Sequence, residues 1–499
     1  MNKKQVIILI AFLLILILPY VISYLMTGNG YQFNGFLVNP TDGHSYLAKM
    51  QLGSSGEWLF RLPYTSKPGD GVFLFTYYIV LGHIASLLHL PSIIIFHVAR
   101  IINSAFLFFV LTKYVKIYIN EKWTLYSIGI LCFGSGLGWL VLLFGYVNTD
   151  FNIPELYPFL SCLTNPHFPL AIALMLIILD RSRDLRLINI FITSTLSILL
   201  LIIQPFCMVI ILGILSISIL LAFRENLRAK VIQLFALAVP SIAFGLYLTM
   251  IIKENPALSS WNSQNLTPSP PIWDLLIALS PVILPAIYGI VSVIKAKEKA
   301  YYPLVIWTIL VIFLAYLPLN LQRRFLIGLY IPVALLGIKG IILVAENIRG
   351  KIKNIVFSAA IPSNIILIAL SISAVTQNNP NLVMRDSLSE GLQWINSYVL
   401  NGSTILTSPQ IGLYIPAYTN QRVIYGHPYE TANAKLNQAN VDAFFSRMDK
   451  SEQQKYLIDE DIDFVLTNID TDNLLPKYSL DYLDLEYKSE DVKIYSAKK

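Results

Sequence analysis

Charged residues are scarce in this chain, and their scarcity excludes an ordinary soluble domain. Asp, Glu, Lys and Arg make up 13% of the 499 residues, whereas hydrophobic residues make up 55%. Soluble globular domains carry about 25% charged residues. The mean hydropathy of the chain is +0.62. Such a composition is typical of a protein that crosses a membrane several times.

Cysteine is rare as well. The chain has three, Cys132, Cys162 and Cys207, each within or beside an apolar run. An odd and widely spaced set argues against a disulfide framework and shows no metal-ligand spacing. The sequence also lacks internal repeats and low-complexity tracts.

Acidic residues are few in the first three quarters of the chain. Residues 1–375 hold 25 Lys and Arg against 13 Asp and Glu, whereas residues 376–499 hold 11 against 17. We therefore expect the two regions to lie in different surroundings. A basic excess in an apolar region indicates cytoplasmic loops beside membrane helices and argues against nucleic-acid binding.

Long apolar runs are what the first region has in abundance. A transmembrane helix needs about 20 apolar residues. Eleven runs of this kind lie near residues 6–26, 93–117, 123–147, 166–180, 187–204, 206–223, 231–252, 272–294, 301–319, 325–345 and 352–375. The first could pass for a signal peptide, but its apolar part is too long and no small-residue cleavage site follows. We therefore expect an uncleaved span there.

Small basic clusters between the apolar runs predict which side of the membrane each connecting loop faces. The clusters are Lys3/Lys4, Lys113/Lys116/Lys122, Arg181/Arg183/Arg186, Arg224/Arg228/Lys230, Lys295/Lys297/Lys299 and Arg349/Lys351/Lys353. The positive-inside rule places such clusters in the cytoplasm. Eleven spans satisfy the rule for every cluster, with the N-terminus cytoplasmic and the C-terminal region outside.

The predicted fold class is an α-helical polytopic membrane protein with about 11 transmembrane helices. Residues 1–375 form its membrane domain, in which residues 27–92 are a first outer loop with juxtamembrane helices. Residues 376–499 form an extracytoplasmic, soluble α/β domain. The predicted location is the cell membrane, with multiple passes.

A twelfth apolar stretch, Gly71–Leu90, conflicts with this count. If it crossed the membrane, every later basic cluster would change side, unless another run failed to cross. The stretch also carries His83 and His89, which suit an interface better than lipid. We interpret it as a helix on the outer surface, and a true span remains the alternative on length alone.

The first outer loop contains "NPTDGHSYLAKMQLGSSGEW" (Asn39–Trp58). Tyr46, Leu47 and Met50 fall on one face of the helix that this pattern predicts, so we expect the helix to lie on the membrane. Asp42 at its start has two interpretations. It is either the N-cap of the helix or an acid available for chemistry.

Other polar residues are expected at the outer ends of the spans. Asp150 and Glu155 lie in a second outer loop, and His167 follows the predicted start of a span at Pro166. The cations of this side are Lys67, His97, Arg100, Arg323 and Arg324. Carboxylates facing guanidinium groups suit an anionic amphiphile such as a lipid phosphate. Polar loops, interfacial side chains and arginines that reach lipid headgroups are the alternatives.

These features together resemble the C-type membrane glycosyltransferases (GT-C superfamily), especially protein O-mannosyltransferases and aminoarabinose lipid A transferase. The resemblance lies in "DGHSYLAKMQLGSSGEW", in "KPGDGVFLF" before the surface helix, and in Ala99–Arg100 of the next span. An acidic second loop and an outer C-terminal domain complete it. It covers most of residues 1–350 in architecture and short patches in sequence.

The resemblance implies transfer of a sugar from a polyprenyl-phosphate donor to a protein, glycan or lipid acceptor on the outer face, with inversion. It implies that Asp42 is the general base and that Asp150 or Glu155 is the second-loop acid. It places the donor phosphate at Lys67, Arg100 and the Arg323/Arg324 pair. The full predicted substrate-binding set is His44, Tyr46, Lys67, His97, Arg100, His167, Arg323, Arg324 and His427.

The chain also departs from these relatives. Many have Asp-Glu where this chain has Asp42-Gly43, and Lys-Pro-Pro where it has Lys67-Pro68-Gly69. The oligosaccharyltransferase branch uses its second-loop acid to help bind a divalent metal, so the sequence leaves a metal open and requires no cofactor.

The C-terminal region alternates helix and strand patterns. "STILTS", "RVIYG", "IDFVLTN" and "VKIYS" predict short strands, and "LSEGLQWINSYV", "VDAFFSRM" and "SEQQKYLIDE" predict helices. "YGHPYET" (Tyr425–Thr431) holds His427 and Glu430, either as an acceptor-side loop or as a structural turn. "GSGLG" (Gly134–Gly138) lies inside the third run and has the spacing for close helix packing.

Two other classes of function stay open. A lipid or glycolipid transporter or flippase would carry polar residues at mid-span on several helices, whereas here they lie at the outer ends. A non-catalytic envelope-assembly protein could keep the fold without the activity.

Overall fold

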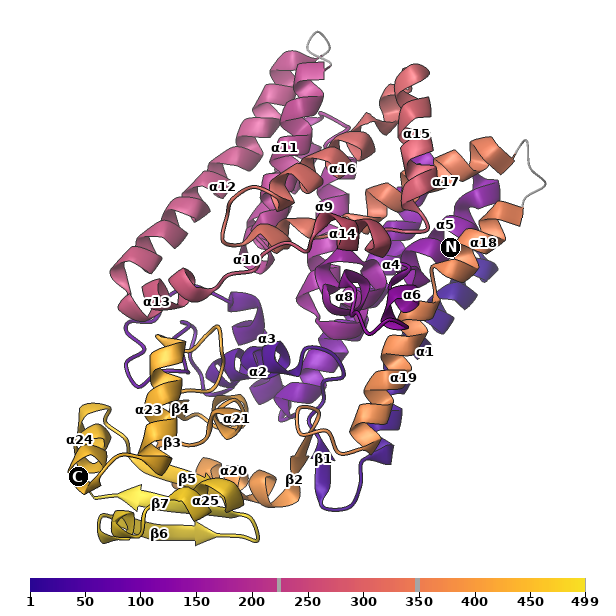
Figure 1. Ribbon diagram of the computed structural model, residues 1–499. Coiled ribbons are helices and arrows are strands. Elements are labelled where there is room, and N and C mark those ends of the chain that lie inside the picture. The colour runs from indigo at the N-terminus through magenta and orange to yellow at the C-terminus, as the bar shows by residue number, and fades with distance from the viewer. Residues whose placement is uncertain (222–225, 346–350, 499) are drawn as a thin grey trace. The chain divides into compact units, whose positions relative to one another are not determined.

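The computed structural model describes residues 1–221, 226–345 and 351–498 (Figure 1). Arg224 and Arg349 of the predicted basic clusters lie outside these residues. The chain divides into two compact units. Unit 1 comprises Met1–Ile22, His97–Leu246 and Thr267–Ser373, and unit 2 comprises Ser23–Phe96, Tyr247–Leu266 and Ala374–Lys499.

Unit 1 is helical, and every predicted apolar run coincides with a helix or a pair of helices. The helices that belong wholly or mostly to it are α1 (Lys3–Met26), α4 (Ser92–Tyr118), α5 (Glu121–Phe133), α6 (Gly138–Leu142), α7 (Thr149–Asn152), α8 (Pro158–Thr164), α9 (His167–Arg181), α10 (Leu187–Ile203), α11 (Phe206–Leu221), α12 (Leu227–Glu254), α14 (Ile272–Ala278), α15 (Ile283–Lys295), α16 (Tyr302–Ala315), α17 (Tyr330–Ala345), α18 (Lys351–Ala359) and α19 (Pro362–Thr376). Short 3-10 turns join some of them: η1 (Pro154–Leu156), η2 (Lys299–Tyr301) and η3 (Gln322–Leu326).

The helices support a membrane protein but leave the number of spans open. Among the described residues, five helical segments are long and apolar enough to cross a membrane, or six if α14 and α15 form one span bent by 92°. Several others, such as α10 and α11, are apolar but shorter. The count of about 11 spans therefore stays a prediction.

The third predicted span is not a continuous helix, which corrects our interpretation of "GSGLG". α5 ends at Phe133 and α6 begins at Gly138. The glycines between the two helices contact other segments of the chain. For example, a Cβ on Gly136 would collide with the carbonyl of Ala278. The loop is therefore shaped by close backbone contact, not by helix–helix packing.

Unit 2 is built around the helices of the predicted first outer loop, α2 (Pro40–Ser54) and α3 (Thr76–Leu88). Their backbones touch, because a Cβ on Gly53 would collide with the Ile79 carbonyl and one on Gly82 with the Met50 carbonyl. The rings of Tyr46 and Tyr78 stack with their centroids 4.4 Å apart. Close glycine contacts of this kind fix the register of two helices.

Two expectations for α2 are wrong. The helix is buried from Gly43 to Met50, packed between α3 and α22 (Ile415–Tyr418), so it does not lie on the membrane by one face. It begins at Pro40 after Asn39, whose φ is 50°, so Asp42 is the third residue of the first turn and not the N-cap. A carboxylate in the first turn is still favoured by the helix dipole.

Gly71–Leu90, the stretch that conflicted with the predicted number of spans, contains the short helix α3. Its 13 residues give a length of about 20 Å, which is less than the roughly 30 Å of a bilayer core. Several predicted spans are also short helices, so the surface placement of α3 stays a prediction.

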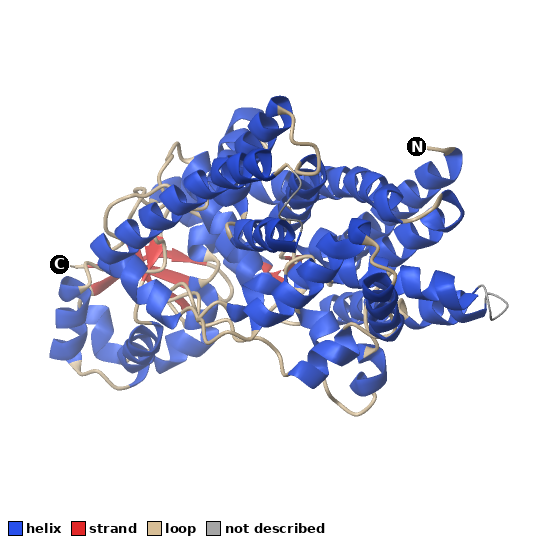
Figure 2. Cartoon of the chain, turned by 90° about the horizontal axis from the view of Figure 1, so that it is seen from above, coloured by secondary structure: helices blue, strands red, loops and turns tan. Residues whose placement is uncertain are grey.

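The C-terminal region of unit 2 forms a five-stranded sheet, the larger of two sheets among the described residues (Figure 2). Its order is β4-β3-β5-β7-β6. The strands are β3 (Thr404–Leu406), β4 (Arg422–Val423), β5 (Phe464–Asn468), β6 (Leu483–Lys488) and β7 (Val492–Ala497). β3 is parallel to β4 and β5, whereas β7 is antiparallel to β5 and β6. The sheet is thus partly parallel, and β6 is the strand that the sequence did not predict.

Helices pack on this sheet and close its hydrophobic core. They are α20 (Asp386–Tyr398), α23 (Ala434–Ser446) and α24 (Lys450–Asp459). A second, two-stranded sheet pairs β1 (Tyr31–Phe33) with β2 (Val383–Arg385) in antiparallel register. This pairing binds the first outer loop to the C-terminal region within one unit.

The surface placement of α3 has a direct test. Pro91 follows this helix and is exposed, and the three native cysteines are buried. We expect a Pro91→Cys variant to react in intact cells with a membrane-impermeant thiol reagent. Labelling that requires permeabilised cells would contradict eleven spans.

Candidate functional site

A cluster of charged side chains in unit 2 joins α2 to the loop Gly426–Thr431. Asp42, Ser45 and Lys49 are spaced three and seven residues apart along α2, so they share one face of the helix. Lys49 and Asp42 each meet a residue of the loop, Glu430 and His427 respectively. We refer to these five residues as the loop-1 cluster.

The base of the cluster is a buried ion pair. Lys49 Nζ lies 2.8 Å from Glu430 Oε1 and 2.9 Å from Oε2, and it donates to Ser45 Oγ at 2.5 Å. The side chains of Lys49 and Glu430 are 1% and 15% exposed. Burial acts to raise the pKa of Glu430, but the Lys49 charge and hydrogen bonds outweigh it and hold that pKa below its usual value. Glu430 is therefore charged at neutral pH.

The loop itself is held by hydrogen bonds from its own backbone. The Thr431 hydroxyl accepts from the amides of Gly426 and His427. His427 Nδ1 accepts from the amides of Tyr429 and Glu430, at 3.1 and 3.0 Å. An Nδ1 that accepts two hydrogen bonds carries no proton, so neutral His427 has its proton on Nε2.

That proton faces Asp42. His427 Nε2 lies 3.7 Å from Asp42 Oδ1, which is beyond a hydrogen bond but close enough for the N–H dipole to favour the charged carboxylate. The His427 side chain is 2% exposed and that of Asp42 is 43% exposed. The Asp42 carboxylate is therefore accessible to solvent, and the buried imidazole of His427 lies next to it.

Tyr64 closes the buried side of the cluster. Its ring centroid lies 5.8 Å from that of His427, and its hydroxyl has no hydrogen-bond partner among the described residues. Burial, and then the negative charge of Glu430, raise the pKa of Tyr64 well above its ordinary value, so it stays protonated.

Of the two α2 residues predicted in the substrate site, Tyr46 lies on this face, with its ring centroid 5.3 Å from Lys49 Nζ, whereas His44 lies away from it. The His44 ring packs edge-on against Phe36 and Tyr414. Burial lowers the pKa of His44 to about 4, opposed in part by its hydrogen bond to the Pro40 carbonyl. Both side chains therefore support the packing of α2.

Lys67, expected at the donor phosphate, is exposed and lies 3.3 Å from Glu460 Oε1. It also donates to the Asp459 carbonyl. The structure thus places it in a surface ion pair with the end of α24.

In unit 1, Asp150 lies in a buried pocket of backbone donors. Its Oδ2 accepts from the Gly138 amide at 3.1 Å. Burial raises the pKa of Asp150 to about 6, against hydrogen bonds from Ser363 and the Gly138 and Gly136 amides that lower it. The broken third span therefore serves to hold this acid.

Asp274 beside it is a residue that sequence reasoning left among ordinary outer acids. Its carboxylate accepts from the Tyr146 hydroxyl, the Asn148 side chain and the Thr149 amide, at 2.6, 2.6 and 2.9 Å. This network fastens the predicted second outer loop to α14.

Glu155 and Arg323 do come together, as a carboxylate facing a guanidinium. Arg323 Nε lies 3.5 Å from Glu155 Oε1, with the side chains 31% and 1% exposed. Arg324 follows in the same short turn, η3, and is also half-buried.

Arg100, which was expected at the donor phosphate, makes structural contacts within unit 1. Its guanidinium donates to the carbonyls of Cys162, Leu163 and Leu16 and lies over the ring of Tyr20. Its Nε contacts His97 Nδ1 at 3.2 Å, which agrees with the predicted shared face. His167 is buried near Phe168.

A divalent metal does not fit the residues found. Among the described residues, no group of three or more His, Cys, Asp or Glu side chains gathers as a metal would require. The loop-1 cluster offers one accessible carboxylate, and Gly43 stands where relatives have a second acid.

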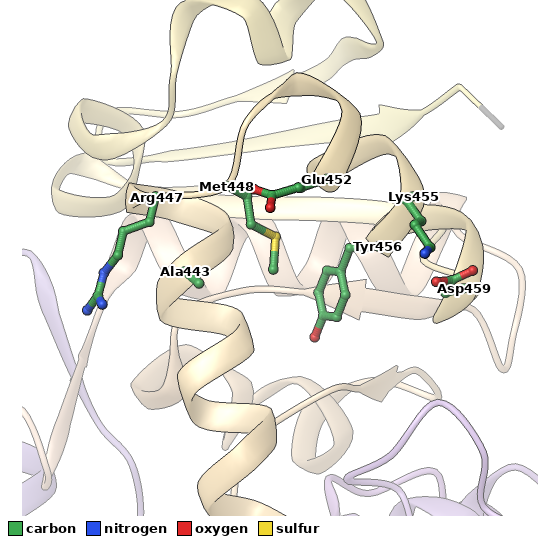
Figure 3. Close-up of a pocket in the computed structure, with 7 residues that line it drawn as sticks. All are labelled: Ala443, Arg447, Met448, Glu452, Lys455, Tyr456 and Asp459. Atoms are coloured by element: carbon green, nitrogen blue, oxygen red, sulfur yellow. The ribbon is translucent and has the colours of Figure 1, made fainter.

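A separate, shallow hollow of about 490 Å³ lies between α23 and α24 (Figure 3). Met448 and Tyr456 line its middle, Arg447 lies at one end, and Lys455 lies beside Asp459 at the other. Its charges are of both signs, and none of its lining residues belongs to the loop-1 cluster.

Neither a protein-family model nor a curated protein sequence matches the chain. Solved structures match its fold. The oligosaccharyltransferase of Archaeoglobus fulgidus, solved with a tethered acceptor peptide containing the NVT sequon, is similar over 98% of this chain and 74% of its own length, with 13% identity and a TM-score of 0.56. ArnT from Cupriavidus metallidurans, solved with undecaprenyl phosphate, is similar over 99% of this chain and 98% of its own, with 11% identity and a TM-score of 0.53. The archaeal enzyme has also been solved with an inhibitory peptide and a dolichol-phosphate, with 11% identity and a TM-score of 0.52.

These structures are GT-C glycosyltransferases, so the resemblance drawn from the sequence is confirmed at the level of the fold. They are membrane proteins, which agrees with the apolar helices of unit 1.

The buried ion pair makes a prediction about stability. In Lys49→Met, Glu430 keeps its charge without its partner, and breaking a buried pair in this way costs about 3–5 kcal/mol. We expect a lower unfolding temperature for Lys49→Met and recovery in Lys49→Met/Glu430→Gln. The exposed Lys435→Met is the matched control. Equal unfolding temperatures for Lys49→Met and the parent protein would contradict the pair's role.

The same pair sets a pH dependence. Because the pKa of Glu430 is lowered by folding, its stabilising contribution is complete above the ordinary glutamate value and is lost as pH falls through the folded-state value. The gap in unfolding temperature between the parent protein and Lys49→Met is therefore expected to shrink on acidification, because protonation of Glu430 removes both the ion pair of the parent and the unpaired charge of the variant.

Proposed function

We propose that the chain is a membrane glycosyltransferase that transfers a sugar from a polyprenyl-phosphate donor to an acceptor on the outer face of the membrane. Two observations support the proposal. The fold is similar to that of GT-C enzymes along nearly the whole chain, and Asp42 is an accessible carboxylate that lies beside the buried side chain of His427. The second observation carries the argument, because a fold alone does not define an activity.

Asp42 is the proposed general base. An acceptor hydroxyl or amine must lose its proton as it attacks the anomeric carbon, and a positioned carboxylate can take that proton. Asp42 is suited to this because it is accessible while its neighbours in the cluster are buried. Attack opposite the departing lipid phosphate inverts the anomeric configuration.

His427 is the proposed positioning residue for this base. Two amides prevent Nδ1 from carrying the proton, so Nε2–H points at the carboxylate. The ion pair of Lys49 and Glu430 in turn holds the loop that carries His427. A side chain supported in this way keeps one orientation while the substrate changes.

The departing phosphate needs cations where negative charge develops. Arg323 and Arg324 are the proposed residues, since Glu155 orients the first of them. We leave Arg100 out, because carbonyl oxygens occupy its donors, and Lys67, because it pairs with Glu460. ArnT and the archaeal oligosaccharyltransferase have been solved with undecaprenyl phosphate and dolichol-phosphate, which supports a polyprenyl-phosphate donor here.

The central prediction concerns Asp42→Asn. The amide keeps the shape of the side chain but cannot accept the proton, and loss of a general base typically lowers the rate by about 10²–10⁴-fold. We expect sugar transfer to collapse while binding of the polyprenyl-phosphate donor survives. Asp70→Asn, an exposed acid of the same loop, is the control. Near-normal turnover in folded Asp42→Asn would refute the base, whereas lipid translocation without transfer in the parent would favour a flippase.

His427→Gln separates positioning from binding. We expect kcat to fall about 10–100-fold with little change in the acceptor KM. We also expect the acidic limb of the rate–pH profile to move to higher pH, because Nε2–H no longer favours the charged carboxylate. His83→Gln is the control, because His83 is a half-buried histidine of the same unit that stacks on Trp58. An unshifted profile with a raised KM would instead make His427 an acceptor contact.

A further inference from the structure

A short helix of unit 2, α13 (Pro256–Gln264), has no residue in the loop-1 cluster but contacts the loop that completes it. Its start is fixed by Asn255, whose side-chain oxygen caps the helix. The side-chain nitrogen of Asn255 donates to the carbonyls of Pro68 and Asp70, at 3.4 and 3.1 Å. The helix is therefore anchored to the segment that precedes α3.

At the other end of α13, Gln264 binds the backbone of the loop that carries Glu430. Its Nε2 donates to the carbonyls of Thr431 and Tyr429, the latter at 3.3 Å. Its Oε1 accepts from the Ala434 amide at 3.2 Å. A side-chain amide can bind carbonyls and an amide at once, because it has both donors and an acceptor. Glu430 lies between the two residues whose carbonyls are bound, so Gln264 restrains the backbone on both sides of it.

Ser260, one helical turn before Gln264, holds the residues that follow in the same loop. The Asn433 amide donates to Ser260 Oγ at 2.9 Å, and this hydroxyl donates to Asn433 Oδ1 at 3.0 Å. Between these contacts, Ala432 packs in one hydrophobic cluster with Leu258 of α13. Polar and apolar contacts therefore join consecutive residues of the loop to α13.

α13 also supports the other half of the ion pair, Lys49. The Trp261 ring packs edge-on against Phe75, with the ring centroids 5.9 Å apart. Lys49 Nζ lies 4.3 Å from the centroid of the Phe75 ring, where the quadrupole of the ring attracts the cation. Phe75 has a φ of 53°, a strained conformation for a bulky residue that persists only when its surroundings hold it. The helix thus contacts both the loop of Glu430 and the ring that faces Lys49.

We propose that α13 is a positioning element for sugar transfer and that Gln264 is its principal residue. By restraining the backbone around Glu430, Gln264 keeps the loop in the conformation in which His427 Nε2–H faces Asp42. Gln264 acts through the loop, because both ends of its side-chain amide bind backbone groups. This role rests on the proposed function of Asp42 as the general base. A misplacement of about 1 Å caused far from the reacting atoms can lower a rate by about 10²-fold.

Gln264→Met in the full-length protein tests this role, because methionine keeps the length of the side chain and makes none of the three hydrogen bonds. The matched control is Gln454→Met, at an exposed glutamine of the same unit. Sugar transfer is measured with polyprenyl-phosphate sugars and membrane acceptors extracted from the source cells. We expect kcat to fall about tenfold while the apparent acceptor KM stays unchanged.

Two further readouts separate positioning from general loss of structure. We expect the acidic limb of the rate–pH profile to move to higher pH in Gln264→Met, as in His427→Gln, because Nε2–H no longer faces the carboxylate. We also expect Gln264→Met/His427→Gln to be no slower than His427→Gln alone, because both changes act through the same imidazole. Full additivity of the two effects would contradict a shared route.

Amide hydrogen exchange tests the contacts without turnover. We expect residues 427–434 to exchange faster in Gln264→Met than in the parent protein, whereas the amides of β5 keep their protection. Gln264→Glu is the second variant if Gln264→Met does not fold, as judged from its unfolding temperature. Its carboxylate still accepts from the Ala434 amide but cannot donate to the carbonyls, so the same fall in kcat is expected.

Each other outcome contradicts a definite part of the proposal. Unchanged exchange in folded Gln264→Met would overturn the contacts, and faster exchange with a normal kcat would overturn the positioning role. A raised acceptor KM at constant kcat would make Gln264 an acceptor contact. Transfer that survives Gln264→Met but collapses in Asp42→Asn would overturn the role of Gln264 alone, whereas transfer that survives Asp42→Asn would overturn the general base itself.

Discussion

The buried ion pair between Lys49 and Glu430 is the constraint on which the candidate site depends. A charged lysine inside a helix that is buried on most sides is tolerable only with a partner, and the partner comes from the loop after β4. Once that contact forms, the spacing of α2 places Asp42 two turns away on the same face. The backbone of the loop then aims His427 at it. The position of Asp42, the charged state of Glu430 and the tautomer of His427 therefore all follow from the need to pair the buried Lys49.

Much of the helical unit could be predicted, because a run of about 20 apolar residues has few stable arrangements other than a helix in lipid. The interruption at Gly134–Leu137 could not be, since it arises from contacts with Ala278 and Asp150, distant in sequence. The burial of α2 was missed for a similar reason. Its pattern shows one apolar face, but both α3 and α22 cover it, and small residues such as Gly53 carry the packing without a hydrophobic signal.

The site could be predicted residue by residue but not as an arrangement. Asp42 and His427 stood out individually, whereas their proximity depends on a tertiary contact that no local pattern records. The sequence did contain a signal for Lys49, because this lysine follows Asp42 by two helical turns inside an apolar stretch. We assigned Arg100 to phosphate binding because a cation near lipid often marks the site of an anionic ligand. The carbonyls of Cys162 and Leu163 that occupy it lie on another helix.

The distance along the chain between the two halves of the ion pair affects biogenesis. Lys49 and Glu430 are 381 residues apart, so α2 is synthesised and exported long before its partner loop exists. During that interval Lys49 must remain hydrated, and α2 cannot adopt its buried packing. Domains emerge and fold from the N-terminus onward during synthesis. Unit 2, which carries Asp42, therefore matures last, and a nascent chain that still lacks Glu430 has not yet assembled the loop-1 cluster.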